Sequence, residues 1–337
     1  MTEASKARLT YVDIGKGLGM MMIVWMHIWG NNAYGFTPPQ KKLLNWNICK
    51  IYVPLFFVLS GYLISVDVKD YKAAVMKKAK SILRPFAVMY VLSFVASFIL
   101  SLLGIGSKHA FAWTNFFNPL LSKTFFNGPL WFLLALFWAF FLLFTIIKAC
   151  RGKVLLLILV SVAIGCVGFY LGRMKVTLPL FMGQGFVGCP MLIIGYLIKK
   201  YIGRHFLGNK LLTFGMAVVG LLLFVAFSSS LSMQDNAYDG MYPLFLLGVT
   251  GGSVMFISLS VLLEKYLPFA AYWGRYSLVV LCLHNFILIP VTQVVAKFIH
   301  LSAVWAITTF IIVYLAFLVV IPLVIKFAPS LFNIKKK

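Results

Sequence analysis

Long apolar runs recur along this chain, each roughly twenty residues long and separated by short polar gaps. A helix needs about 20 apolar residues to cross the hydrocarbon core of a bilayer. Because backbone polar groups must be paired inside the bilayer, such runs cross it as helices. We therefore predict an all-α, polytopic integral membrane protein with about ten transmembrane helices, at 12–32, 48–66, 83–104, 129–148, 154–172, 179–198, 211–230, 243–263, 275–296 and 303–326.

The composition agrees with this class. The chain is 62% hydrophobic and 11% charged, whereas soluble domains average about 45–50% apolar and about 25% charged. The formal net charge of +23 does not indicate nucleic acid binding, because the basic residues lie in the short gaps that flank the apolar runs. We expect one membrane domain over 1–337, with the first run kept as an anchor rather than cleaved as a signal.

The distribution of lysine and arginine predicts the topology. If the N-terminus lies in the cytoplasm, 21 of the 30 basic residues fall in cytoplasmic segments, 8 fall outside, and Lys16 lies within the first helix. Cytoplasmic loops of membrane proteins carry such an excess. We therefore expect both termini in the cytoplasm and a multi-pass protein of the inner (cytoplasmic) membrane, in contact with its lipids.

The first apolar run, YVDIGKGLGMMMIVWMHIWG, carries Asp13, Lys16 and His27. A charge at the centre of a membrane helix costs about 2.5–3.5 kcal/mol on insertion scales. Eleven steps of 100° bring Lys16 and His27 onto one face, about 16 Å apart along the axis. Met20 and Ile23 fill the space between them, and Asp13 lies one turn before Lys16 on nearly the same stripe.

Two interpretations of this stripe stay open. In the first, Asp13 and Lys16 are boundary residues, Lys16 reaches towards lipid phosphates, and His27 is bonded to another helix. In the second, the stripe lines a path across the bilayer and takes part in function, as ionisable residues in membranes commonly do. The shared face favours the second interpretation.

The same stretch resembles the first helix of the membrane acyltransferase-3 family, the O-acyltransferases of cell-surface carbohydrates. That family carries a basic residue, ten intervening residues and a histidine, which here are Lys16 and His27. Lysine at the basic position is similar to the branch of smaller, single-domain O-acetyltransferases. Later fragments resemble further family helices in the expected order: FFVLSGYLI (56–64), KAKSILRPF (78–86), GPLWFLLALF (128–137) and GRYSLVVLCLH (274–284).

The resemblance implies transfer of an acyl group, usually acetyl, from cytoplasmic acyl-CoA to a hydroxyl of a surface glycan or lipid-linked saccharide. Acetyl-CoA is then a co-substrate. Attack by a hydroxyl on a thioester needs a base and stabilisation of the charge on the carbonyl oxygen. Because imidazole titrates at about pH 6.5, we expect His27 to act as base or acyl relay. Lys16 would hold a phosphate or the thioester carbonyl, and Asp13 would orient Lys16.

Other segments supply further candidates. Lys80 and Arg84 are expected to bind the phosphates of CoA, with Arg84 favoured because it would open the third helix; ordinary membrane topology is the alternative explanation. The scattered cysteines lack metal-ligand spacing, so no metal is predicted. Candidates for the wall of a substrate cavity, each with helix packing or interface anchoring as its alternative, are Ser60, Tyr62, Trp131, Gln184 and His284.

Two rival functions remain at this stage. Buried charges and broken helices also serve transporters, so the chain could be a flippase of lipid-linked sugars. Inverted internal repeats would favour that class, and none is visible in the sequence. The second rival is a non-catalytic component of a polysaccharide export complex, in which the stripe only packs. The sequence does not indicate an oligomeric state.

Overall fold

The computed structural model describes residues 9–30, 51–64, 70–103, 111–124, 126–151, 153–203, 205–227, 231–300 and 302–334 of the chain. Nearly all of this part is helical. Its one sheet is a hairpin of two short antiparallel strands, β1 (Leu231–Ser232) and β2 (Ala237–Tyr238). The predicted all-α class is therefore confirmed.

Eight helices in the described ranges are long and apolar enough to cross a membrane. A multi-pass membrane protein follows. These helices are α4 (Tyr71–Leu102), α5 (Trp131–Cys150) with the 3₁₀ turn η3 (Gly128–Leu130) before it, α6 (Val154–Arg173), α7 (Met182–Leu197) between η4 (Pro179–Phe181) and the π turn η5 (Ile198–Ile202), α9 (Lys210–Phe227), α10 (Tyr242–Leu262), α12 (Ser277–Phe298) and α13 (Ser302–Phe327).

Two of the ten predicted runs form helices that are shorter or less apolar than these eight. α1 (Thr10–Gly30) has 21 residues and so extends about 32 Å, but its polar stripe and its glycines make it less apolar than the eight. α3 (Tyr52–Tyr62) has 11 residues and extends only about 16 Å. Ends of the predicted runs, at 31–32, 48–50, 65–66, 104 and 228–230, lie outside the described residues.

The start of α4 differs from the prediction. The helix begins at Tyr71, twelve residues before the predicted start at 83, and the side chain of Asp70 caps it by accepting a hydrogen bond from the backbone N–H of Ala73 at 3.0 Å. Lysine, alanine and methionine are good helix formers, so the basic segment continues the helix. The prediction that Arg84 opens this helix is therefore wrong. The short helices η2 (Trp113–Leu121), α8 (His205–Gly208), η6 (Glu264–Tyr266) and α11 (Pro268–Arg275) were also not predicted.

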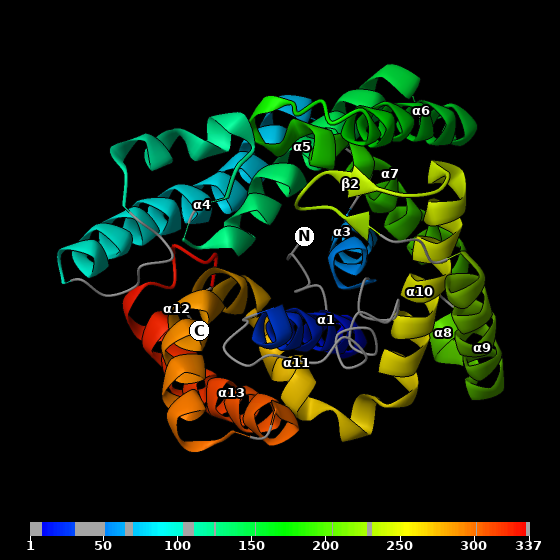
Figure 1. Ribbon diagram of the computed structural model, residues 1–337. Coiled ribbons are helices and arrows are strands. Elements are labelled where there is room, and N and C mark those ends of the chain that lie inside the picture. Colours follow the sequence, from blue (N-terminus) through cyan, green and yellow to red (C-terminus); the bar gives the residue numbers. More distant parts are fainter. Residues whose placement is uncertain are drawn as a thin grey trace.

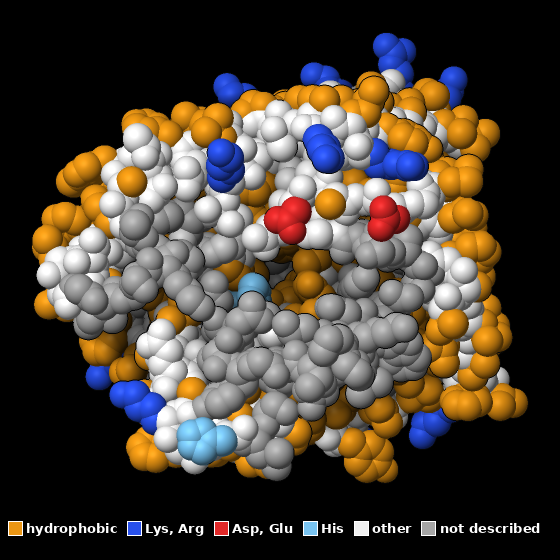
Figure 2. Space-filling model, in the orientation of Figure 1, with side chains coloured by type: hydrophobic (Ala, Val, Ile, Leu, Met, Phe, Trp, Pro, Cys, Tyr) orange, Lys and Arg blue, Asp and Glu red, His pale blue; other side chains and the backbone are white. Residues whose placement is uncertain are grey.

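The helices surround α1, which lies near the middle of the bundle (Figure 1) and contacts α3, α10, α11, α12 and α13. The apolar stretches of α7 and α10 are each 72% buried, whereas those of α9 and α13 are only 22% and 17% buried. Apolar side chains accordingly cover the rim of the molecule (Figure 2). Soluble monomers rarely expose such large contiguous apolar surfaces, and lipid contact accounts for them.

Candidate active site

Two glycines fix the rotation of α1 about its own axis. A Cβ atom at Gly17 would overlap the backbone of Ala270, and one at Gly274 would overlap the backbone of Asp13. Small residues allow two helix backbones to approach this closely. The contact holds α1 against α11, so the position of every other side chain on α1 is set, including those of Lys16 and His27.

The Lys16–His27 face of α1 borders a cavity of about 460 Å³. Met20 and Ile23 line the same wall between these two residues. Small-molecule sites usually measure about 300–1,000 Å³, so this space is large enough for a ligand. The face found by helical periodicity thus opens on an internal space rather than on lipid.

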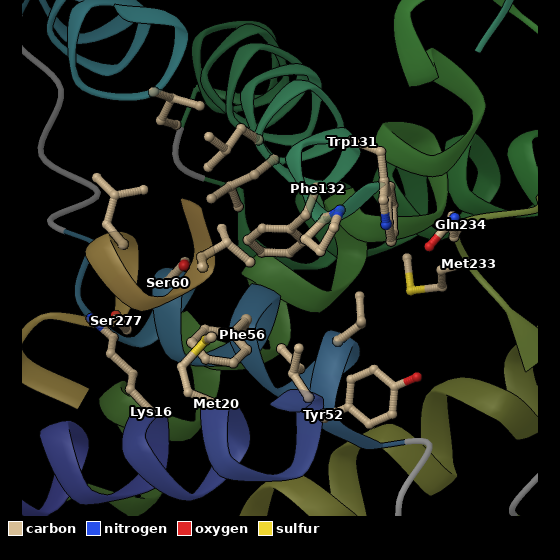
Figure 3. A pocket seen from close by; sticks show the side chains of 18 of the residues that line it. Lys16, Met20, Tyr52, Phe56, Ser60, Trp131, Phe132, Met233, Gln234 and Ser277 are labelled. Atoms are coloured by element: carbon tan, nitrogen blue, oxygen red, sulfur yellow. The ribbon is translucent and has the colours of Figure 1, made fainter. Parts of the chain in front are cut away.

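Polar side chains gather at two ends of the cavity, and apolar ones lie between them (Figure 3). The first end holds Lys16, Ser60 and Ser277, the second holds Tyr52, Trp131 and Gln234, and Met20, Phe56 and Phe132 lie between. On the predicted topology the first end faces the cytoplasm and the second faces outwards. Figure 2 shows a hollow at the centre of one face of the molecule, with a histidine side chain inside it.

The β1–β2 hairpin forms part of the second end. The backbone oxygen of Gln234 accepts a hydrogen bond from Nε2 of Gln184 at 3.2 Å. Tyr238 stacks on Phe169 with ring centres 4.9 Å apart, and burial raises the pKa of the Tyr238 phenol well above its usual range, so it stays neutral. Gln184 therefore supports the wall from behind. The hairpin residues that line the cavity are Ser232, Met233 and Gln234.

The segment after α13 closes another part of the wall. Phe332 and Asn333 line the cavity, and Nδ2 of Asn333 donates a hydrogen bond to the backbone oxygen of Ser81 at 2.9 Å. Asn333 has φ of 56°, a left-handed conformation that asparagine adopts more readily than most residues. This turn brings the end of the described chain against α4 beside the Lys16 end.

A second histidine lies behind His27. The rings of His27 and His284 have centres 5.1 Å apart and are tilted by 45°. His284 is fully buried and does not line the cavity, whereas His27 does. Nδ1 of His284 lies 2.9 Å from the backbone oxygen of Val280 and 3.0 Å from that of Leu281. Both histidines are candidates from the sequence, and the fold brings them together.

The basic residues of α4 divide into two groups. Lys80 and Arg84 are exposed and do not line the cavity. Arg84 lies one turn before Val88, which is 38% exposed, so it shares the lipid-facing side of α4. Lys78 instead is half-buried, with Nζ 3.9 Å from the ring centre of Phe140, and lies within electrostatic range of Lys16.

Two further candidates take structural positions. Asp13 is 6% exposed and does not line the cavity, and its backbone carries the contact with Gly274. The hydroxyl of Tyr62 lies 2.8 Å from that of Tyr11, which ties α3 to α1. Ser60 and Trp131 line the cavity. Tyr52, Ser277, Gln234 and Asn333 also line the cavity but were not candidates from the sequence, because their only signal is a single polar group beside an apolar run.

In the part of the chain that the structure describes, no group of three or more His, Cys, Asp or Glu side chains lies close enough together to bind a metal ion. A family model described as an acyltransferase domain matches residues 9–326. The match includes α1 and every part of the cavity wall except Phe332 and Asn333. No curated protein and no solved structure matches the chain.

Proposed function

This chain belongs to the membrane acyltransferase-3 family, and from that membership we propose that it is an O-acetyltransferase of carbohydrates. The donor is acetyl-CoA from the cytoplasm. The acceptor is a hydroxyl of a cell-surface or lipid-linked saccharide at the outer face of the inner (cytoplasmic) membrane. Transfer of acyl groups is the activity of the family. The identities of the donor, the acceptor and the membrane are what we propose.

The observation that carries this proposal is the cavity beside α1. It joins a cationic end at Lys16 to an end with hydrogen-bonding and aromatic side chains at Gln234 and Trp131, with His27 in its wall. A donor and an acceptor that approach from opposite sides of a membrane need one shared space in which to react. A cavity with two polar ends and an apolar middle supports that arrangement.

His27 has the chemistry of the base. Its imidazole takes the proton from the acceptor hydroxyl while the hydroxyl oxygen forms a bond with the thioester carbonyl carbon. The bond between carbon and sulfur breaks, and the imidazolium returns the proton to the departing CoA thiolate. The products are the O-acyl sugar and free CoA, so atoms and charges balance. A base with this position is worth about 10²–10⁴ in rate.

The donor end is the cationic end. Lys16 lines the cavity and Lys78 lies within electrostatic range of Lys16, so a second positive charge lies near this end. CoA carries phosphates, and such charges attract them at a range set by the ionic strength. The long pantetheine arm then lies along Met20 and Phe56 towards His27. Lys80 and Arg84 are assigned to the lipid boundary instead.

The acceptor end has the groups that bind sugars. Trp131 and Tyr52 offer aromatic faces, and Gln234 and Ser232 offer amide and hydroxyl groups to sugar hydroxyls. Pockets of this kind fix a ligand by a few convergent polar groups among apolar ones. These side chains come from three elements, α5, α3 and the hairpin, so the acceptor site forms only in the folded chain.

Purified protein in lipid nanodiscs tests the function. Acetyl-CoA labelled in the acetyl group and saccharides extracted from the native cell surface should give an alkali-labile, labelled ester, and the His27→Ala variant should form it at least about 10²-fold more slowly. If neither acetyl-CoA nor longer acyl-CoA donors give a labelled ester, the proposal is contradicted. Movement of a lipid-linked saccharide across sealed vesicles without label transfer would identify a flippase instead.

Replacing Lys16 separates a charge that binds the donor from one that only reaches lipid phosphates. We expect Lys16→Ala to lower kcat/KM for acetyl-CoA about 10- to 100-fold, because a hydrogen bond to a charged group contributes about 1.5–3 kcal/mol. Lys16→Arg should keep activity within about tenfold, since the charge is retained. The test is donor titration at two salt concentrations. Equal activity of the alanine and arginine variants would assign Lys16 to the lipid boundary.

Two lysines of α4 form a matched pair for the donor site. Lys78→Met should raise KM for acetyl-CoA several-fold, because Lys78 is half-buried and lies within electrostatic range of Lys16. Lys80→Met, two residues further along the same helix, should leave KM unchanged, because that side chain is exposed. Steady-state kinetics with both variants in the same lipid decide this. Equal KM values would show that the segment acts only through its net charge.

A further inference from the structure

The protonation of His284 is set by its own helix. Nδ1 lies 2.9 Å from the backbone oxygen of Val280 and 3.0 Å from that of Leu281. Carbonyl oxygens only accept hydrogen bonds, so Nδ1 must carry a proton and donate it. In the neutral ring Nε2 is then an acceptor. The backbone of α12 thus selects one tautomer and leaves one defined lone pair.

That lone pair has no partner in the described part of the chain. Nε2 of His284 is buried, has no hydrogen bond, and belongs to a residue with 0% of its surface exposed. Buried acceptors left unpaired are costly and uncommon in native proteins. The ring of His27 is its neighbour, with centres 5.1 Å apart.

The helix around His284 is fixed in place. Nδ2 of Asn127 donates a hydrogen bond to the backbone oxygen of Cys282 at 2.8 Å, and both residues are buried. Asn127 comes directly before η3 and α5, whose residues Pro129 and Trp131 line the cavity. Since His284 is two residues from Cys282, its ring is held at a set position relative to the cavity wall.

We propose that His284 is the positioning residue of His27, an inference that rests on the proposed function. During turnover an N–H of the His27 imidazole donates to Nε2 of His284, which leaves the other nitrogen of His27 unprotonated and directed at the acceptor hydroxyl. A turn of the His27 ring in the ligand-filled cavity makes this bond. Catalytic hydrogen bonds are often long in the free enzyme and tighten with substrate bound.

Three substitutions at 284 separate positioning from packing. The amide of glutamine falls near the place of Nε2 and can accept from His27, whereas the amide of asparagine falls near Nδ1 and cannot reach it. Leucine supplies neither group. We expect His284→Gln to keep kcat within about fivefold, and His284→Asn and His284→Leu to lose about 10²-fold. KM for acetyl-CoA should stay within about twofold in all three, because the donor end is not touched.

A spectroscopic measurement gives a second readout that needs no turnover. Solid-state ¹⁵N NMR of histidine-labelled protein in lipid bilayers, with the His27→Ala spectrum to assign His27, reports which ring nitrogen carries the proton. We expect one neutral tautomer of His27 in the wild type and in His284→Gln. Both tautomers should appear in His284→Leu, because no acceptor then selects one.

The outcomes are distinguishable. If His284→Asn is as active as the wild type while His284→Gln is not, the bond to the α12 backbone is what matters, and His284 is only structural. If all three variants match the wild type while His27→Ala is inactive, His27 works without it; both results overturn the proposal. If the wild type itself transfers no acetyl group, the proposed function fails. In that case the NMR measurement still tests the proposed hydrogen bond between His27 and His284. A single, unchanged tautomer of His27 in His284→Leu would overturn it.

Discussion

Replacement of His27 by alanine is expected to lower kcat for acyl transfer by about 10²–10⁴-fold, the usual contribution of a general base. His27 lines the cavity, and in the proposed reaction its imidazole takes the proton of the acceptor hydroxyl. The substitution removes a polar group from a membrane helix, so insertion should not suffer. The measurement is single-turnover transfer from labelled acetyl-CoA, which separates chemistry from binding.

His205 provides the matched control for this experiment. It is also a histidine within a helix, α8, but it is exposed and lies outside the cavity wall. We expect His205→Ala to transfer at the wild-type rate. Near-normal turnover by a well-folded His27→Ala variant would remove His27 from the reaction, whatever the family membership of the chain.

Replacement of Gly17 by alanine is expected to cost about 1–3 kcal/mol of stability or to displace α1 from α11. The added Cβ would overlap the backbone of Ala270, which has no flexible end that could move aside. Any shift of α1 moves Lys16 and His27 together, because both are on that helix. Misplacement of a reacting group by about 1 Å can cost about 10²-fold in rate, so we expect a comparable loss in the folded fraction of this variant.

Gly215 of α9 is the control for this second prediction. It too lies within a long helix, but a Cβ there meets nothing within 4 Å. Gly215→Ala should therefore be neutral or stabilising by up to about 1 kcal/mol, since alanine is the better helix former. Thermal unfolding in one detergent, followed by transfer assays, compares the two variants. Equal behaviour of the two would mean that the close contact of α1 with α11 does not fix the site.

The helices were predictable because crossing a bilayer demands length and apolarity, and both are local properties of the sequence. The predicted run at 154–172 and the helix Val154–Arg173 agree to within one residue. The start of α4 was not predictable from apolarity, because helix propensity and the cap at Asp70 extend it through a basic segment. The shortness of α3 was likewise hidden in an apolar run that continues beyond it.

The site was predictable only where one helix carries it. The Lys16–His27 face follows from the 3.6-residue period, and these residues do share the cavity wall. Periodicity does not say which side of a helix faces lipid when apolar residues cover all of it. Arg84 was predicted to bind the donor because it would open the third helix, but α4 begins at Tyr71 and Arg84 lies on its exposed side. The contributions of Gln234 and Asn333 depend on contacts between distant segments, which no local pattern encodes.

The wall segment at Phe332 and Asn333 has a consequence for how the protein is made. These residues follow Lys16 by about 300 positions, and they complete the space that Lys16 borders. At about 5–20 residues per second, a ribosome needs roughly 15–60 s to travel that distance. Throughout this interval the polar stripe of α1 stands in or beside the bilayer without its full enclosure. The cavity wall that Lys16 borders is therefore complete only after the segment that follows α13 has been synthesised.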